Sequence, residues 1–292
     1  MRFTLPARKP FNFLSVIQSH GWYQLAPFDF DEGSNTLHYV LQLANGRIIE
    51  LHMRDGVDGV AVETEKLDTL ERREVAGKVA WMFGLDMDFS RFYAATRGEP
   101  KLARLQARAL GRVLRSPTLF EDVIKTILTT NTLWTATKNM TRKLVNEFGA
   151  PLEEEPDKRA FPTPAAIAAS SPEVLKEKVR VGYRASAIHR LGVRVATGEL
   201  DLESLKTSTL PTLELRKQLL TLNGVGPYAA ANLLMILGRT DFIPIDSYAL
   251  KMVSHEWYKG KPVTAREVEK RFEKWGEFKG LAFWFWDWSY QG

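Results

Sequence analysis

The stretch KQLLTLNGVGPYAAANLLMILGRTDFIPID, residues 217–246, decides the fold of this chain. Two apolar runs typical of helices flank the turn Leu222–Gly226, which is so short and glycine-rich that it predicts a tight hairpin between helices. The second run begins with Pro227, and proline is favoured in the first turn of a helix because its missing N–H costs nothing there. This helix therefore directs free N–H groups over the glycines, where a phosphodiester can approach the backbone closely.

Asp246 is the only charged residue of the apolar segment Ile243–Asp246 that follows this hairpin. A part-buried carboxylate is costly unless it has hydrogen-bond partners. Asp246 could therefore serve as the N-cap of a helix beginning at Ser247, or it could have a chemical role. The two interpretations are compatible.

Composition narrows the class of protein. The 292 residues are 45% hydrophobic and carry a net charge of +5, which suits a polyanionic partner without requiring one. The chain has no cysteine, so disulfides, cysteine-ligated zinc and cysteine-ligated iron–sulfur clusters are excluded. No signal peptide and no 18-residue apolar run is found, and we expect a cytoplasmic protein of a bacterial nucleoid that does not engage a membrane.

The first part of the chain has the pattern of β-structure. Asn45-Gly46 separates an apolar run at residues 37–43 from another at residues 47–53, a strong indication of a hairpin. A further turn at Asp55-Gly56 and a run at residues 57–62 indicate a third strand. The sequence therefore predicts an antiparallel meander.

From Asp68 onward the patterns are almost entirely helical. Apolar residues at Val75, Val79, Met82 and Phe83 have the spacing of one buried helix face. Similar patterns predict helices at residues 102–114, 118–131 and 136–148, the first of them basic, with either a solvated face or a DNA contact. Residues 150–164 are rich in proline and glutamate and are the best linker candidate.

The expected fold class is thus α+β, with an antiparallel β-sheet domain at the N-terminus and a mostly α-helical core of two lobes. We expect a β domain at residues 1–67, connecting helices at residues 68–115 and the helical core at residues 116–292.

The motifs of this helical part resemble those of the helix-hairpin-helix GPD superfamily of DNA glycosylases. Leu222–Gly226 followed by Pro244-Ile245-Asp246 is similar to the hairpin and aspartate of that superfamily. Residues 83–93 and 120–131 resemble segments of bacterial 3-methyladenine glycosylases, whereas Gly182-Tyr183-Arg184-Ala185 is similar to a turn of 8-oxoguanine glycosylases. The resemblance covers about residues 70 to 292, and it implies a monomer that binds double-stranded DNA containing a damaged base.

The resemblance also implies roles for individual residues. An enzyme that acts on a base must take it out of the duplex, and another group must fill the gap. Asn131 and Tyr183 would be the plug and the wedge, unless they are a helix C-cap and a core tyrosine, and Arg184 would contact the orphaned base or a phosphate. The backbone amides of Gly224, Gly226 and Tyr228 would also contact the DNA. A monovalent cation, Na or K, would bind the backbone carbonyls of Leu220, Leu222 and Val225.

The expected chemistry depends on Asp246 and Tyr228. Cleavage of an N-glycosidic bond gives the sugar oxocarbenium character, which a nearby carboxylate stabilises while it orients water. Glycosylases of the superfamily that also cut the backbone carry a nucleophilic lysine at the position of Tyr228, and a phenol cannot form a Schiff base. We therefore expect hydrolysis without lyase activity, and neither a required cofactor nor zinc nor an iron–sulfur cluster.

The excised base is harder to predict. The missing lysine favours an alkylated purine such as 3-methyladenine, held by aromatic stacking. Candidates for the wall of the base pocket are Trp134, Tyr228, Trp284 and Trp286. Two alternatives remain open, an 8-oxoguanine-type glycosylase with absent or unusual lyase activity, and a non-catalytic protein that binds lesions or abasic sites.

Overall fold

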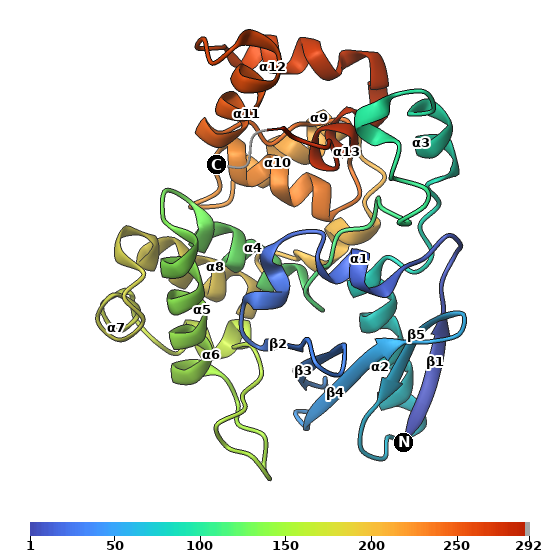
Figure 1. Cartoon of the computed structure of the whole chain (residues 1–292). Coiled ribbons are helices and arrows are strands. Elements are labelled where there is room, and N and C mark those ends of the chain that lie inside the picture. The colour runs from blue at the N-terminus through green and yellow to red at the C-terminus, as the bar shows by residue number, and fades with distance from the viewer. Residues whose placement is uncertain (290–292) are drawn as a thin grey trace. The chain divides into compact units, whose positions relative to one another are not determined.

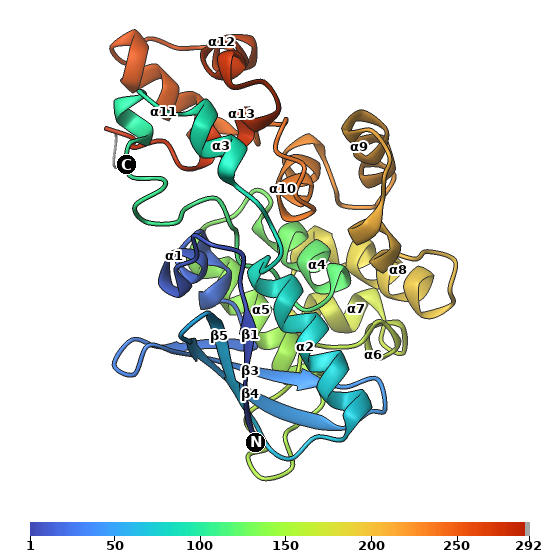
Figure 2. The same ribbon diagram turned by 90° about the vertical axis from the view of Figure 1, so that its right-hand side faces the viewer.

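The structure is a computed structural model that describes residues 1–289, so the last three residues of the predicted core at 116–292 lie outside it. The chain forms two compact units (Figures 1 and 2). Unit 1 comprises Met1–Met87, Arg112–Ser208 and Leu222–Gly224, and unit 2 comprises Asp88–Gly111, Thr209–Thr221 and the chain from Val225 onward. Among residues 1–289, no helix is both long enough and apolar enough to cross a membrane.

Unit 1 contains a five-stranded antiparallel sheet in the order β1-β5-β4-β3-β2. The predicted meander is confirmed, and two strands that were not predicted lie at the edges, β1 paired with β5 and β2 paired with β3. In the β3–β4 hairpin, residue Leu43 donates its N–H to the carbonyl of Arg47 at 2.8 Å, and Gly46 takes a positive φ of 90°. The strands are Arg2–Pro6 (β1), Phe28–Asp31 (β2), Thr36–Gln42 (β3), Ile48–Asp55 (β4) and Gly59–Glu63 (β5).

The helices of unit 1 include α2, which packs against the sheet, and a group from α4 to α8 (Figure 1). Helix α2 begins with a capping box, since Asp68 accepts from the Glu71 amide at 2.8 Å and Glu71 accepts from the Asp68 amide at 2.9 Å. The α-helices are Phe13–Ile17 (α1), Thr69–Phe83 (α2), Leu119–Thr129 (α4), Trp134–Phe148 (α5), Pro164–Ala168 (α6), Pro172–Val174 (α7) and Ala185–Ala196 (α8). Short 3-10 or π turns are Gly21–Gln24 (η1), Leu175–Val179 (η3), Gly182–Arg184 (η4) and Glu203–Thr207 (η5).

Helix α4 is buried along its length and joins the sheet to the helical group. The Tyr39 hydroxyl of β3 donates to Glu121 Oε2 at 2.6 Å, and the same carboxylate lies 2.6 Å from the ammonium of buried Lys125. Trp22 of η1, which lies in the N-terminal segment, donates its Nε1–H to Asp122 Oδ1 of α4 at 2.8 Å. The sheet and α4 therefore share one core, and the compact units differ from the predicted division at residues 67 and 115.

The prediction of a helix at residues 102–114 is wrong. Only Pro100–Leu102 (η2) is helical there, and the chain turns through positive φ angles of 50° at Ala109 and 137° at Gly111. Arg112 is buried, and its guanidinium donates to the carbonyl oxygens of Arg8 at 2.7 Å and Gly84 at 2.9 Å. Its basic side chain thus satisfies backbone groups of unit 1 and faces neither solvent nor DNA.

Residues 150–164 are likewise no linker between the units. Leu152 and Ala160 pack with Val40 of the sheet in one apolar cluster, and Pro151 forms an isolated bridge with Arg159. The segment is a loop folded back on the sheet within unit 1.

Unit 2 is helical. Its C-terminal aromatic residues form a cluster in which the Trp286 ring lies 5.2 Å from Trp257, 5.4 Å from Phe272 and 5.5 Å from Trp275, between centroids. The helices are Ser90–Ala95 (α3), Thr212–Leu220 (α9), Pro227–Ile236 (α10), Ser247–Tyr258 (α11), Ala265–Phe272 (α12) and Lys279–Trp284 (α13), with a 3-10 segment at Glu273–Phe278 (η6).

Candidate active site

In unit 1 the loop after α4 presents Asn131. The helix ends at the C-cap Thr130, and Asn131 follows in the left-handed region with a φ of 44°. Asparagine is among the few residues that adopt this conformation readily, but Asn131 follows the C-cap Thr130 and is not itself the predicted C-cap. The side chain is exposed, so the same geometry leaves it accessible to a ligand.

Tyr183 in η4 is 70% exposed, so the alternative of a core tyrosine is wrong. Its hydroxyl lies 3.4 Å from Thr130 Oγ1, and the Arg184 guanidinium carbon lies 4.5 Å from its ring centroid. An exposed aromatic ring supported from one side by a cation is suited to insertion between bases. The contact with DNA itself stays a prediction.

Arg184 has a different setting from the one expected, because it is buried and its donors are already used. Its Nη2 donates to the Thr130 carbonyl, and its Nε donates to the Ile127 carbonyl at 3.2 Å. The side chain therefore joins the Tyr183 turn to the end of α4, just before Asn131. In this structure it supports both turns instead of presenting its guanidinium to a base or a phosphate.

A cleft of about 510 Å³ lies beside these turns within unit 1. Gly224 of the predicted hairpin loop lines it with a φ of +85°, and a Cβ there would lie 3.0 Å from the Cβ of Ala187. Glycine is thus required both by conformation and by space. Sequence reasoning missed several lining residues, because nothing local marks them: Thr130, Ser186, His189, Arg190 and Asn223.

In unit 2 the hairpin continues with Gly226, the N-cap of α10, and Pro227 at its first position. Gly226 is exposed, and a Cβ on it would meet nothing within 4 Å. No side chain of residues 1–289 caps this helix, so the first-turn amides, including that of Tyr228, keep their capacity to bind an anion.

Asp246 is the N-cap of α11, where its Oδ1 accepts a hydrogen bond from the Ala249 amide at 2.8 Å. The predicted capping role is therefore confirmed. Within the described residues the carboxylate makes no second hydrogen bond, so Oδ2 keeps its acceptor capacity. The side chain is half-buried.

The Tyr228 phenol belongs to the same surroundings. Burial raises its pKa above the ordinary value, and the negative charge of Asp246 raises it further, whereas a side-chain hydrogen bond with Asn232 lowers it. Asn232 lies one helical turn after Tyr228 and donates its Nδ2–H to the Tyr228 carbonyl at 2.9 Å. Tyr228 is therefore a neutral phenol at neutral pH that is influenced by the charge of Asp246.

The predicted tryptophans have three different settings. Trp286 is only 5% exposed because it packs in the aromatic cluster of unit 2, and its assignment to the pocket wall stays a prediction. Trp134 is half-buried, donates its Nε1–H to Gln24 Oε1 at 2.9 Å and covers Gly21. Trp284 is half-buried at the end of α13. Base stacking by Trp134 and Trp284 stays a prediction.

The carbonyls predicted for a monovalent cation belong to the loop between α9 and α10. Leu220 is the last residue of α9, and the side chains of Leu222 and Val225 are buried. Cation binding by Leu220, Leu222 and Val225 stays a prediction.

Comparison with known proteins gives the family. A profile of the HhH-GPD superfamily base excision DNA repair proteins matches residues 124–278, more than half of the chain. No curated protein matches the chain at a significant level of similarity.

Solved structures share the fold over nearly the whole chain. A 3-methyladenine DNA glycosylase from Archaeoglobus fulgidus is 22% identical with a TM-score of 0.74, over 98% of this chain and 97% of that one. The 8-oxoguanine glycosylase/lyase of Clostridium acetobutylicum, solved with double-stranded DNA containing cytosine opposite 8-oxoguanine, is 20% identical with a TM-score of 0.72, over 94% of this chain and 90% of that one. Because the superfamily profile covers more than half of the chain, the protein belongs to the HhH-GPD superfamily of base excision DNA repair proteins.

Proposed function

We propose that the protein is a monofunctional DNA glycosylase that hydrolyses the N-glycosidic bond of an alkylated purine such as 3-methyladenine. The observation that carries this proposal is Tyr228, a phenol at the position where lyases of the superfamily have a lysine. A phenol forms no Schiff base, so water is the nucleophile. Alkylated purines suit this chemistry, since a cationic base leaves with less assistance.

Asp246 supplies the electrostatic part of the mechanism. Its Oδ1 is fixed by the Ala249 amide, which orients the carboxylate without adding a counter-charge, and Oδ2 is the oxygen available to the reacting sugar. As the glycosidic bond breaks, the carboxylate stabilises the oxocarbenium character of the sugar and accepts a proton from the attacking water. Tyr228 borders this carboxylate with an O–H group that stays protonated at neutral pH.

Residues of unit 1 would open the duplex. Exposed Tyr183 inserts beside the flipped nucleotide, and Asn131 fills the gap that the base leaves, while the amides of Gly224, Gly226 and Tyr228 bind the backbone. In this proposal Arg184 acts by holding the first two turns together, as its bonds to the end of α4 indicate.

A second candidate is an 8-oxoguanine-type glycosylase without lyase activity. The Gly182–Ala185 turn, in which Tyr183 is exposed, is the feature that favours it. Without a lysine at position 228, such an enzyme would also release its base by hydrolysis.

Mass spectrometry of the bases released from damaged genomic DNA tests the proposal. We expect free 3-methyladenine or 7-methylguanine from methylated DNA, leaving abasic sites that break only after alkali. Release of 8-oxoguanine from oxidised DNA would establish the second candidate instead. Covalent trapping of the protein on DNA by borohydride would refute the role given to Tyr228. Tight binding of abasic DNA without release of any base would identify a non-catalytic binding protein.

A further inference from the structure

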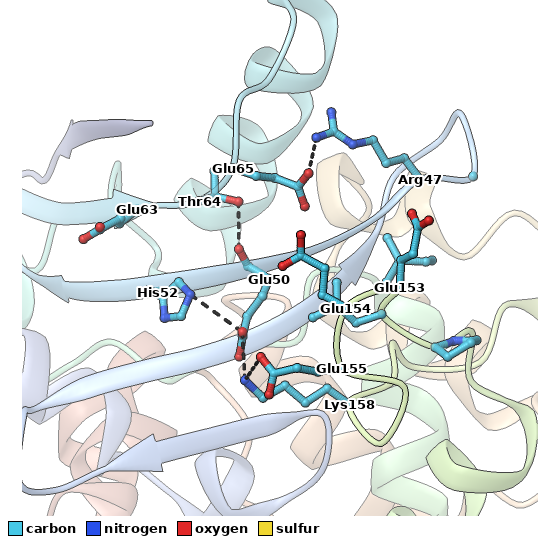
Figure 3. A pocket seen from close by; sticks show the side chains of 14 residues that line it. Arg47, Glu50, His52, Glu63, Thr64, Glu65, Glu153, Glu154, Glu155 and Lys158 are labelled. Atoms are coloured by element: carbon cyan, nitrogen blue, oxygen red, sulfur yellow. Dashed lines mark hydrogen bonds and ion pairs between the residues drawn. The ribbon is translucent and has the colours of Figure 1, made fainter.

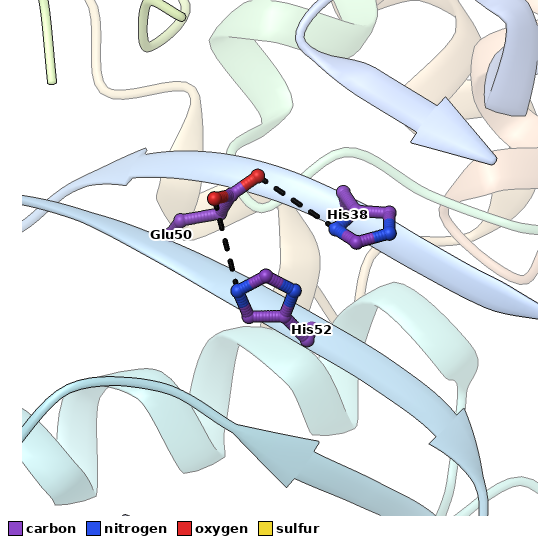
Figure 4. Close-up of side chains that lie close together, drawn as sticks. All are labelled: His38, Glu50 and His52. Atoms are coloured by element: carbon purple, nitrogen blue, oxygen red, sulfur yellow. Dashed lines mark ion pairs between the residues drawn. The ribbon is translucent and has the colours of Figure 1, made fainter. Parts of the chain in front are cut away.

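Three metal-ligating side chains meet on the sheet of unit 1 (Figure 4). Glu50 and His52 are two residues apart on β4, so they point to the same face. His38 of β3 is the cross-strand partner of His52 and points to that face as well. The antiparallel register thus brings two imidazoles and one carboxylate together at a place that has no part in the proposed glycosylase chemistry.

The donor atoms are close enough to share one ion. One ligand atom from each residue lies within 4.8 Å of the others, and each histidine nitrogen lies 3.7 Å from a different oxygen of Glu50. Zinc bonds of about 2.0–2.1 Å in a tetrahedral site separate the ligand atoms by roughly 3.3 Å. Small side-chain rotations of His38 and His52 would therefore complete the coordination.

The chemistry of the donor set selects the type of metal. Two neutral imidazoles and one carboxylate suit a borderline transition metal such as Zn²⁺ better than Mg²⁺ or Ca²⁺, which prefer oxygen ligands.

The surroundings are rich in carboxylates and hold two cations, Arg47, which pairs with Glu65, and Lys158, which pairs with Glu50. A cavity of about 710 Å³ opens beside Glu50 and His52, under the loop at residues 151–158 (Figure 3). Acidic residues line it from both the strands and the loop: Glu63, Glu65, Glu153, Glu154 and Glu155. Lys158 reaches from the loop to Glu50 Oε2 at 3.0 Å and also contacts Glu155 at 3.0 Å. Glu50 is thus neutralised by an ammonium that a metal ion could replace.

We propose that His38, Glu50 and His52 form a binding site for a divalent transition metal of the Zn²⁺ class, in which the metal replaces Lys158 as the counter-ion of Glu50. The remaining coordination position faces the acidic cavity, where water or a glutamate of the loop can occupy it. Metal binding then releases the ion pair between Lys158 and Glu50.

Zinc binding to the full-length, untagged protein tests this site, by equilibrium dialysis at neutral pH. We expect one equivalent of Zn²⁺ to bind, and His38→Ala or His52→Gln to weaken binding by at least about a hundredfold, because even an outer partner of a metal ligand contributes roughly 10–100-fold. His255→Gln is the matched control, since it removes an exposed histidine of unit 2 and should change nothing.

Lys158→Met provides a test that does not depend on the folding of the histidine variants. Removal of the competing ammonium should tighten Zn²⁺ binding by about fivefold, given a Coulomb energy of about 1 kcal/mol for two charges at 4 Å in water. Bound Co²⁺ should show the strong visible absorption of a low-coordinate site in the wild type and lose it in His52→Gln. Unchanged Zn²⁺ affinity in both His52→Gln and Lys158→Met, or equal binding of Mg²⁺, would overturn the proposal.

Discussion

Replacing Asp246 with asparagine separates the two roles of this side chain. Asparagine is as good an N-cap as aspartate, so Asp246→Asn keeps the hydrogen bond from the Ala249 amide and removes only the negative charge. Alanine removes both and lowers the free energy of unfolding by about 1 kcal/mol. The pair of variants therefore distinguishes loss of charge from loss of the cap.

The expected effect on the rate follows from the charge. A carboxylate about 4 Å from a developing positive charge contributes about 4 kcal/mol at an effective dielectric constant near 20, which corresponds to about a thousandfold in rate. Asp246→Asn should thus release methylated purines about a thousandfold more slowly in single-turnover experiments, while its thermal unfolding stays that of the wild type.

Asp241→Asn is the matched control, because it removes a carboxylate from the same loop segment and should keep the wild-type rate. Binding of abasic DNA should be kept in both variants. A rate for Asp246→Asn within about threefold of the wild type, with the fold intact, would refute the electrostatic role of Asp246.

Further predictions concern the hairpin, the wedge and the buried carboxylate of α4. Gly224→Ala should cost about 1–3 kcal/mol in thermal unfolding because of its positive φ, whereas Gly226→Ala should leave stability unchanged and weaken DNA binding in a fluorescence anisotropy assay. Tyr183→Ala should leave unfolding within about 0.5 kcal/mol and weaken binding of abasic duplexes by about 10–100-fold. Burial raises the pKa of Asp122 to about 6. Between pH 4 and 6 the folded state therefore holds a proton that the unfolded state has lost. The contribution of this group to the free energy of unfolding falls as the pH rises through that range. In urea titrations, Asp122→Asn should therefore make the slope of the unfolding free energy against pH more positive by about 1.4 kcal/mol per unit, and a slope equal to that of the wild type would contradict the burial effect. His20→Gln should shift the slope in the opposite direction, because burial lowers the pKa of His20 to about 4 and the unfolded state there binds the extra proton.

Features that depend on neighbouring residues could be predicted from the sequence. The β3–β4 hairpin follows from Asn45-Gly46, and the helix that starts after Asp68 follows from its cap and its apolar spacing. The glycine hairpin and Asp246 belong to this class too, because a turn and a helix N-cap are set by a few adjacent residues.

Features that depend on distant partners could not be predicted in this way. Residues 102–114 have a helical pattern, but the Arg112 side chain satisfies carbonyls about 100 residues away along the chain, and no local pattern reveals that. Likewise, burial of Arg184 against the end of α4 depends on the approach of two turns that are far apart in sequence. Trp286 is one of several similar rings, and only the packing shows that it is enclosed.

The cluster of His38, Glu50 and His52 depends on the length of the loop between β3 and β4. The chain turns between Leu43 and Arg47 through a three-residue loop, which pairs His38 with His52. A two-residue Asn-Gly turn would shift the register by one and pair His38 with Met53 instead, and all side chains of one strand would then face the other way relative to its partner.

The shared core around α4 also limits how this protein can be divided. The superfamily profile begins at residue 124, inside a helix whose residues are buried on every side, partly by Trp22 and Tyr39 of the N-terminal region. A fragment that began at the helical part would leave apolar surface and the ion pair of Lys125 uncovered. The N-terminal sheet is therefore part of the core of unit 1 and not a detachable appendage.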